Sequence, residues 1–234
     1  KTITLGSEDF IANVVAEEGG SFGDIYVRGF QRNDAGEILV GTNGLPKLTS
    51  KKTVKVGNAN PDWTGGWSNT FRYKNLSLNV LIDTKQGGKI VSFTDAVLSG
   101  YGSTARTLAG REGGIVFPGV LDSGEKNTKE INAETLWTTL GGRNNPVGEV
   151  FVYDASFIRL KEISLSYSFP KSVLGKLPFT GLSLGIYGKN LCYLQNKAGI
   201  FDPEMTVGTG NNQALEAFAL PSTRSFGINL NVSF

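Results

Sequence analysis

The sequence predicts an all-β fold, specifically an antiparallel transmembrane β-barrel segment of about five to seven strands with long extracellular loops. Three observations predict it. Apolar and polar residues alternate in several segments of strand length; 31 glycines and 19% charged residues suit a β-structure with many turns; and short and long connections alternate along the chain. The same alternation also fits the strands of a soluble β-sandwich whose polar residues face bulk water.

The last ten residues, 225–234, carry the clearest alternation. One face of the predicted strand bears the apolar residues Phe226, Ile228, Leu230, Val232 and Phe234. The other face bears serine, glycine and asparagine. A strand of about ten residues can cross a bilayer at the tilt of a barrel strand. We therefore expect the apolar residues to face lipid, and we expect this strand to close and help assemble a barrel.

Two further strands are predicted before the last one. Residues 181–193 alternate in the same way. Residues 155–169 also alternate, but the apolar residues before Lys161 and those after Glu162 have opposite parity. Because a single inserted residue moves side chains to the other face of a strand, this change predicts a β-bulge near Lys161 and Glu162.

A tight hairpin is predicted upstream, with strands at 67–73 and 76–84 around a turn at Lys74 and Asn75.

The region before Trp63 is less regular, although residues 22–30 and 37–40 alternate enough to predict two more strands.

The connections between these strands differ in length. The connection 170–180 is short, whereas the connection 194–221 is long and polar. Roughly seventy residues separate the hairpin from the strand that starts at 155, and we expect them to form a structured external loop with short helices at 93–98 and 134–140. Short turns on one side and long loops on the other are typical of outer-membrane barrels.

Composition argues against several classes of function. The chain has no histidine, so Ser-His and Cys-His catalytic pairs and His-ligated metal sites are excluded, and the single cysteine, Cys192, cannot form an intrachain disulfide. A net charge of +2 without a basic run does not indicate a nucleic-acid partner. No signal-peptide pattern occurs at the start of the sequence. We expect no enzyme activity, no cofactor and no metal.

Several motifs resemble one known family. The run YDASFIRLKEISLSYSFP at 153–170 resembles the signature near the carboxyl end of SusC/RagA-type TonB-dependent outer-membrane transporters. As in that family, LSLGIYGKNLCYL, an Asp-Pro-Glu triplet at 202–204 and a terminal aromatic residue follow. The segment 57–90, with Asn-Pro-Asp-Trp and Gly-Gly, resembles an upstream part of these transporters. The blocks lie in the family's order over about three quarters of the chain.

The resemblance implies a barrel of about 22 strands around an amino-terminal plug. Residues 1–234 would then be the carboxyl-terminal part of that barrel, with the plug absent from this chain. The intact protein would import a nutrient, a glycan or a peptide, across the outer membrane of a Gram-negative bacterium. Its partners would be the rest of the barrel and the plug, a SusD-type surface lipoprotein acting as a lid, TonB through the missing part, and membrane lipid.

Three loop residues are candidate contacts for cargo or lid: Asp202, Glu204 and Trp137. The two carboxylates also suit turn formation or calcium binding, and an acid–base pair of a glycosidase would need both in one cleft. Tryptophans can stack on sugar rings or gather at a membrane interface, and for Trp67 we favour the interface. The alternative function is a soluble, secreted β-rich module that binds carbohydrate in a groove lined by tryptophans.

Overall fold

The computed structural model describes residues 1–8, 11–175, 178, 180–208, 210 and 212–234. The chain divides into two compact units, each built from three separate segments. We call residues 61–87, 155–204 and 221–234 the sheet unit. We call residues 1–60, 88–154 and 205–220 the core unit.

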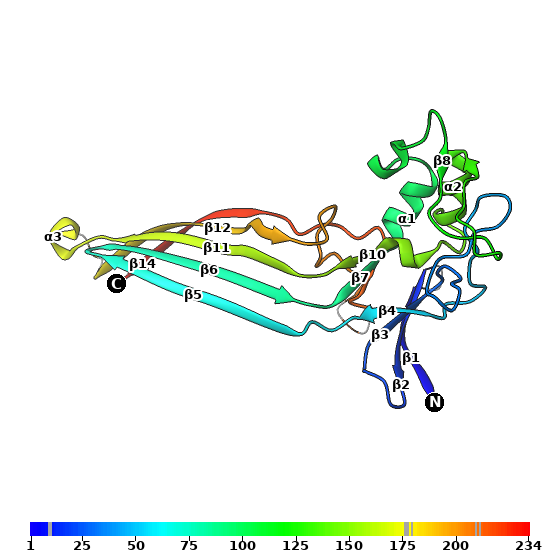
Figure 1. Cartoon of the computed structure of the whole chain (residues 1–234). Helices are drawn as coiled ribbons and strands as arrows, with labels where there is room; N and C mark the ends of the chain where they lie inside the picture. The colour runs from blue at the N-terminus through cyan, green and yellow to red at the C-terminus, as the bar shows by residue number, and fades with distance from the viewer. Residues whose placement is uncertain (9–10, 176–177, 179, 209, 211) are drawn as a thin grey trace. The chain divides into compact units, whose positions relative to one another are not determined.

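The sheet unit is a five-stranded antiparallel sheet (Figure 1). Its strands, in spatial order, are β5 (Trp63–Tyr73), β6 (Leu76–Gln86), β11 (Phe157–Ser168), β12 (Gly181–Asn196) and β14 (Ser225–Ser233). Within this unit each strand pairs with the next one along the chain, as in a meander. The sheet is open, with β5 and β14 at its edges, and the described residues form no closed barrel.

The predicted hairpin is confirmed, and its strands β5 and β6 are longer than the pattern indicated. Tyr73 pairs with Leu76, so Lys74 and Asn75 form the turn. Lys74 has a φ of 51°, a left-handed conformation of the kind found in tight turns.

The predicted bulge in β11 is confirmed as well. The register shifts between Leu160 and Glu162 against both neighbouring strands, β6 and β12. On the β12 side, Asn190 takes up a φ of 52° at the same level of the sheet. Because the bulge restores a common face above and below it, the apolar residues on both sides of Lys161 lie on the same side of the sheet.

The core unit contains the remaining strands and most of the helical residues. The four-stranded antiparallel sheet consists of β1 (Thr2–Glu8), β2 (Ala12–Glu17), β3 (Asp24–Val27) and β4 (Val54–Asn58). The second sheet has β7 (Lys89–Ser92) between β10 (Val152–Asp154) and β13 (Leu215–Glu216), and a third pairs β8 (Ile115–Val116) with β9 (Glu130–Ile131). The helices are α1 (Phe93–Gly100) and α2 (Ala133–Leu140), with 3₁₀ turns η1 (Ala105–Leu108) and η2 (Gly148–Phe151).

Two hydrophobic clusters hold the core unit together. The larger cluster includes Val14, Ile25, Phe151 and Leu215, which are almost completely buried. The second cluster packs residues of α2 against Phe30 and other residues of the loops around it. These side chains come from all three segments of the unit, so its folding requires residues far apart in the sequence to meet.

The two predicted helices are confirmed, and each has a side-chain N-cap. The Ser92 hydroxyl accepts a hydrogen bond from the Asp95 amide at 3.0 Å before α1. The Asn132 side chain accepts one from the Glu134 amide at 2.6 Å before α2. These caps satisfy amide donors that the first helical turn leaves without a partner. None of the helices in the described ranges has the length and hydropathy of a membrane-spanning helix.

Some expectations for the remaining segments are wrong. The strand expected at 22–30 is limited to β3, and residues 37–40 make isolated bridges and no regular strand. The region before Trp63 contains a four-stranded sheet of which only β3 overlaps a predicted strand; in β2 and β3, consecutive buried residues such as Val14 and Val15 weaken the alternation. The connection at 170–180 is short, as predicted, and it contains the helix α3 (Lys171–Leu174); residues 176, 177 and 179 lie outside the described part.

Candidate functional site

One face of the sheet unit carries apolar side chains in cross-strand rows. One row runs Phe71, Leu78, Leu165, Ile186 and Ile228, from β5 to β14. The next row runs Tyr73, Leu76, Tyr167, Leu184 and Leu230. Neighbouring side chains in such rows contact one another across the strands. The alternation seen in single strands is therefore in register over the whole sheet.

The opposite face carries small and polar side chains. One row there runs Arg72, Ser77, Ser166, Gly185 and Asn229. Another runs Thr70, Asn79, Ser164, Tyr187 and Gly227. Because side chains point alternately to the two sides of a strand, this face follows from the register that produces the apolar face.

The apolar residues predicted on the last strand, β14, are exposed in the described structure. The exposed fractions of Ile228 and Leu230 are 74% and 61%, and Phe226 and Phe234 are exposed further still. Val232 is exposed to a smaller extent. A contiguous exposed apolar face of this kind is unusual for a soluble monomer and is typical of a surface that contacts a membrane or another protein.

Two glycines let aromatic rings lie against β14 and β12, one on each face. A Cβ at Gly227 would lie 2.4 Å from Cζ of Tyr187, its partner across the strands on the polar face. On the apolar face, a Cβ at Gly188 would lie 2.7 Å from Cδ2 of Leu191 and 3.2 Å from the ring of Phe226. Each glycine thus leaves room for the side chains that pack against its strand.

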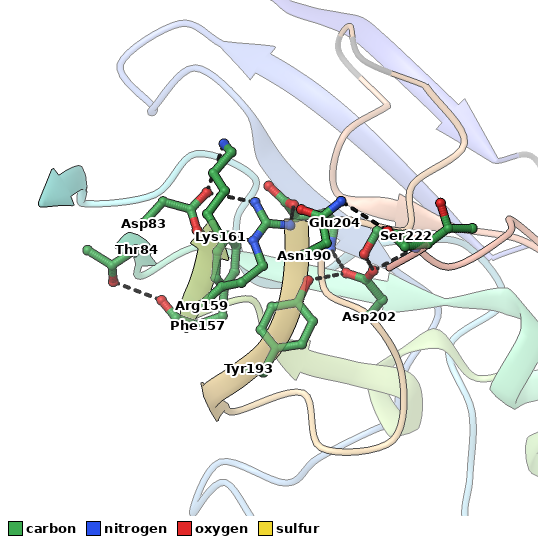
Figure 2. Close-up of polar contacts among 11 residues, drawn as sticks. Asp83, Thr84, Phe157, Arg159, Lys161, Asn190, Tyr193, Asp202, Glu204 and Ser222 are labelled. Atoms are coloured by element: carbon green, nitrogen blue, oxygen red, sulfur yellow. Dashed lines mark hydrogen bonds and ion pairs between the residues drawn. The ribbon is translucent and has the colours of Figure 1, made fainter. Parts of the chain in front are cut away.

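At one end of the sheet unit, Arg159 of β11 is the centre of a polar cluster (Figure 2). Its exposed fraction is 4%. The guanidinium donates two hydrogen bonds to Asp83 of β6, at 3.1 and 2.6 Å, and a further one to Glu204. It also lies over the rings of Phe157 and Tyr193, 5.4 and 5.8 Å from their centroids. Two carboxylates and two rings thus compensate a nearly buried cation.

Asp202 extends this cluster into the loop after β12 (Figure 2). Its carboxylate accepts hydrogen bonds from the Tyr193 hydroxyl at 2.5 Å and from the Ser222 hydroxyl at 2.5 Å. It also accepts the backbone amides of Glu204, at 2.9 Å, and Ser222, at 3.0 Å. Burial by itself would raise the pKa of Asp202, but these hydrogen bonds outweigh it and hold the pKa below the ordinary value of 3.8.

The two carboxylates predicted as candidates therefore both bind their own chain. Glu204 pairs with Arg159, and Asp202 fixes the loop to Tyr193 and Ser222. An acid–base pair needs groups that can reach a substrate proton, whereas Asp202 is occupied by four donors. Among the described residues, no group of three or more Cys, Asp or Glu side chains is placed to hold a metal ion.

Trp137, the third candidate, lies in α2 of the core unit. The Arg106 guanidinium lies 6.0 Å from the centroid of its ring. Its indole N–H is buried and has no hydrogen-bond partner in the part of the chain that the structure describes. The ring lines a cavity of about 650 Å³ between α1 and α2. Trp137 thus belongs to the core unit, whereas Asp202 and Glu204 belong to the sheet unit.

Trp63 and Trp67 belong to β5 and are both exposed. Trp67 pairs with Ile82 in a row next to the apolar rows, so it lies on the apolar face. β5 begins at Trp63, so Trp67 lies inside the strand and not at its start, where the sequence placed it, and its membrane-interface interpretation stays a prediction.

Sequence reasoning missed the residues that organise the loop cluster, above all Arg159 and Tyr193. Both lie within correctly predicted strands, on the face opposite to the apolar one. A charged residue and a tyrosine at paired positions near the strand ends are a weak signal, because the same residues also occur on solvated surfaces.

The chain is similar to known receptors in sequence. It is 28% identical over 205 residues to TonB-dependent receptor P3 of Formosa agariphila, a match that covers 85% of this chain and 19% of the relative. It is 27% identical over 200 residues to TonB-dependent receptor P26 of the same organism, covering 82% and 19%. The chain thus spans about a fifth of the length of these curated relatives. No protein-family model matches the chain.

The fold is similar to that of part of a solved transporter. The structure of the RagAB peptide importer in its closed-closed state matches all of this chain and 25% of that chain, with a TM-score of 0.61 and 19% identity. The open-open state of the same importer matches with a TM-score of 0.58 and 17% identity. At these identities the likeness shows the fold. Together with the receptor relatives, it confirms the resemblance that the motifs indicated.

Proposed function

We propose that this chain, which is similar in sequence to TonB-dependent receptors and in fold to part of the RagAB peptide importer, is part of the barrel wall of an outer-membrane nutrient transporter of the SusC/RagA type. Residues 1–234 would form the carboxyl-terminal part of a barrel of about 22 strands. The sheet unit would supply five neighbouring strands of that wall, and the core unit would be an extracellular loop structure.

The observation that carries this proposal is the two-faced sheet. Apolar rows on one face suit hydrocarbon, and small polar rows on the other suit a hydrated lumen. The strands have 9 to 16 residues, which is enough to cross a bilayer at a tilt. Because hydrocarbon offers no hydrogen bonds, the open edges at β5 and β14 require neighbouring strands. The rest of the barrel would supply them, and β14 would be the closing strand.

The protein would bind its cargo and let it pass by a conformational change, and it would catalyse no reaction, as the similarity to receptors indicates. A SusD-type lipoprotein would cover the external side, TonB would engage the part of the protein that carries the plug, and the cargo would be a glycan or a peptide. The protein would lie in the outer membrane of a Gram-negative bacterium. The RagAB structures, described as those of a peptide importer, support the general class.

Substitution of two adjacent residues in β14 tests this proposal. Ile228 belongs to an apolar row and Asn229 to a polar row. An arginine on a lipid face costs about 2–4 kcal/mol near the bilayer centre and much less in a lumen. We therefore expect Ile228→Arg to reduce the amount of folded receptor in outer-membrane fractions, and Asn229→Arg to leave it near the wild-type amount.

The two variants control for each other, because they add the same charge at successive positions of one strand. Folded receptor is measured by the shift in gel mobility between unheated and heated samples. Equal effects of the two substitutions would contradict a lipid face on one side and a lumen on the other.

A further inference from the structure

We propose that one end of the sheet unit binds the headgroups of anionic phospholipids. The inference rests on the proposed barrel wall and names the lipid that this end would contact. The end comprises the turn at Lys74 and Asn75, the helix α3 and the adjoining ends of β11, β12 and β14, and we call it the α3 end (Figure 1). The Ser168 amide donates to the Asn75 carbonyl at 2.9 Å, so the turn and the end of β11 are joined. In the proposed barrel the short connections face the periplasm, so the α3 end would lie at the periplasmic leaflet.

The acidic residues of the sheet unit lie away from the α3 end. They are Asp62, Asp83, Glu162, Asp202 and Glu204. The segments 63–82, 163–201 and 221–234, which include every strand residue between the bulge and the α3 end, contain no aspartate or glutamate. Cations do occur there, at Arg72, Lys74 and Lys171. Apart from the carboxylate of Phe234, the charged groups in the described residues of the α3 end are therefore positive.

Two lysines of the α3 end are available to an anion from outside the chain. Lys74 and Lys171 are both exposed, and within the described ranges neither forms a salt bridge, whereas Lys161 pairs with Asp83 at 3.1 Å toward the other end of the sheet. The ammonium of Lys74 lies 5.5 Å from the centroid of the Tyr73 ring. Next to a membrane surface, each such lysine should strengthen the binding of an anionic headgroup about fivefold.

Aromatic and apolar side chains border these lysines. The exposed fractions of Tyr73 and Val173 are 73% and 62%, and Tyr167 packs edge-to-face on Phe169 with the ring centroids 5.1 Å apart. Tyrosines gather at membrane–water interfaces, where neighbouring lysines can extend their ammonium groups to the headgroups. A phospholipid offers acyl chains to the apolar side chains and a phosphate to the lysines. It therefore fits both parts of this surface, whereas an acidic protein segment would match the charges alone.

Lipid binding to the full-length receptor in a non-ionic detergent tests the proposal. The probes are phosphatidylglycerol, which is anionic, phosphatidylcholine with the same acyl chains, which has no net charge, and a hexaglutamate peptide. Native mass spectrometry measures how many molecules of each bind at each concentration. We expect phosphatidylglycerol to bind more tightly than phosphatidylcholine, and we expect the double variant Lys74→Asn, Lys171→Gln to weaken phosphatidylglycerol alone, by about 25-fold. Asparagine suits position 74 because it tolerates the left-handed backbone there.

Two further double variants are the controls. Lys74→Arg with Lys171→Arg keeps both charges and should keep the affinity for phosphatidylglycerol. Lys197→Gln with Arg224→Gln removes two exposed cations at the opposite end of the sheet and should change the affinity less than twofold.

The proposal is overturned if phosphatidylglycerol and phosphatidylcholine bind alike, or if the double variants at the two ends have equal effects. Binding of hexaglutamate that depends on Lys74 and Lys171, without binding of phosphatidylglycerol, would overturn it in favour of an acidic protein partner. A receptor that assembles in the outer membrane and tolerates Asn229→Arg but not Ile228→Arg, yet does not distinguish the two lipids, would sink this inference and leave the transporter proposal intact.

Discussion

The positively charged side chain of Arg159 is almost completely buried, and the residues around it compensate its charge. Asp83 of β6 and Glu204 of the loop after β12 form salt bridges with its guanidinium, which also makes cation–π contacts with two aromatic rings. Removing one member of a buried ion pair leaves the other members uncompensated. The cluster should therefore behave as the anchor of the loop that begins at Lys197.

Replacing Arg159 with methionine should release this anchor at a cost of about 3 kcal/mol. Glu204 would lose its ionic partner, and residues 197–204 would be held less tightly. Trypsin should then cleave after Lys197 several times faster in the purified receptor, as measured by the mass-spectrometric yield of the peptide that starts at Ala198.

Lys161→Met serves as the control, because Lys161 also contacts Asp83, at 3.1 Å, but its side chain is about half exposed. Its cleavage rate should stay close to that of the wild type. If both variants are cleaved at the wild-type rate, the cluster does not anchor the loop.

Asp202 should make the stability of this loop depend on pH. Its pKa in the folded protein lies below 3.8, because donors from Ser222, Tyr193 and Glu204 outweigh the effect of burial. A carboxyl group with a lowered folded-state pKa stabilises the protein above its unfolded-state pKa, and this contribution is lost as the pH falls through the folded-state value. The contribution should therefore be complete at pH 7 and should decline below about pH 4.

Asp202→Asn removes the titrating group and provides the comparison. Melting temperatures of wild-type and variant receptor in detergent should differ at pH 7, and the difference should shrink between pH 4 and pH 3. A difference that stays constant down to pH 3 would rule out this role for Asp202.

At the scale of elements, glycines allow the backbones at the C-terminal ends of α1 and α2 to come into contact. A Cβ built at Gly100 would lie 2.1 Å from the backbone nitrogen of Gly142, and one at Gly141 would lie 2.6 Å from the Ala96 carbonyl oxygen. The Gly142 amide donates to that carbonyl at 2.8 Å. The backbones are thus in direct contact at the C-terminal ends of both helices, and no side chain fits between them.

Gly100→Ala should separate the helix ends and destabilise the core unit by about 3 kcal/mol, since added volume at a packed contact forces the backbone to move. The measurement is the melting temperature of the receptor or the resistance of the core unit to protease. Gly208→Ala is the matched control, because Gly208 lies in the same unit and a Cβ there would meet no atom within 4 Å. If the two variants melt alike, the helix contact is not tight.

Elements with a local pattern could be predicted from the sequence. The hairpin around Lys74 and the bulge near Lys161 follow from alternation with a period of two, which a strand imposes on its own residues. Short strands such as β7 and β13 could not be predicted. Each has four residues or fewer, and β13 pairs in parallel with β7 across more than a hundred residues of chain.

At the scale of the whole molecule, the exposed apolar face determines how the isolated chain should behave. Expressed alone in plain buffer, it should associate through that face and through the edges at β5 and β14, since water leaves both uncovered. Analytical ultracentrifugation should show aggregates without detergent and a smaller species in detergent.

A variant with Phe226, Ile228 and Leu230 replaced by threonine should associate less, because it keeps β propensity while reducing the apolar area. A monodisperse wild-type chain that melts cooperatively in plain buffer would instead support the soluble carbohydrate-binding module. In such a module two sheets would pack with their apolar faces inward, whereas the described apolar rows are largely exposed.

The sequence by itself determined the alternating strands, the hairpin, the bulge and the two short helices, because each depends on residues close together in the chain. The tertiary structure decided which side chains from these elements contact one another. Asp202 and Glu204 were recognisable as candidates, but their partners Tyr193 and Arg159 were not, since the Arg159–Glu204 pair spans 45 positions. The core unit is likewise stabilised by apolar side chains from three distant segments, which are buried together away from water. Because these segments are far apart in the chain, a local sequence pattern cannot predict that they pack together.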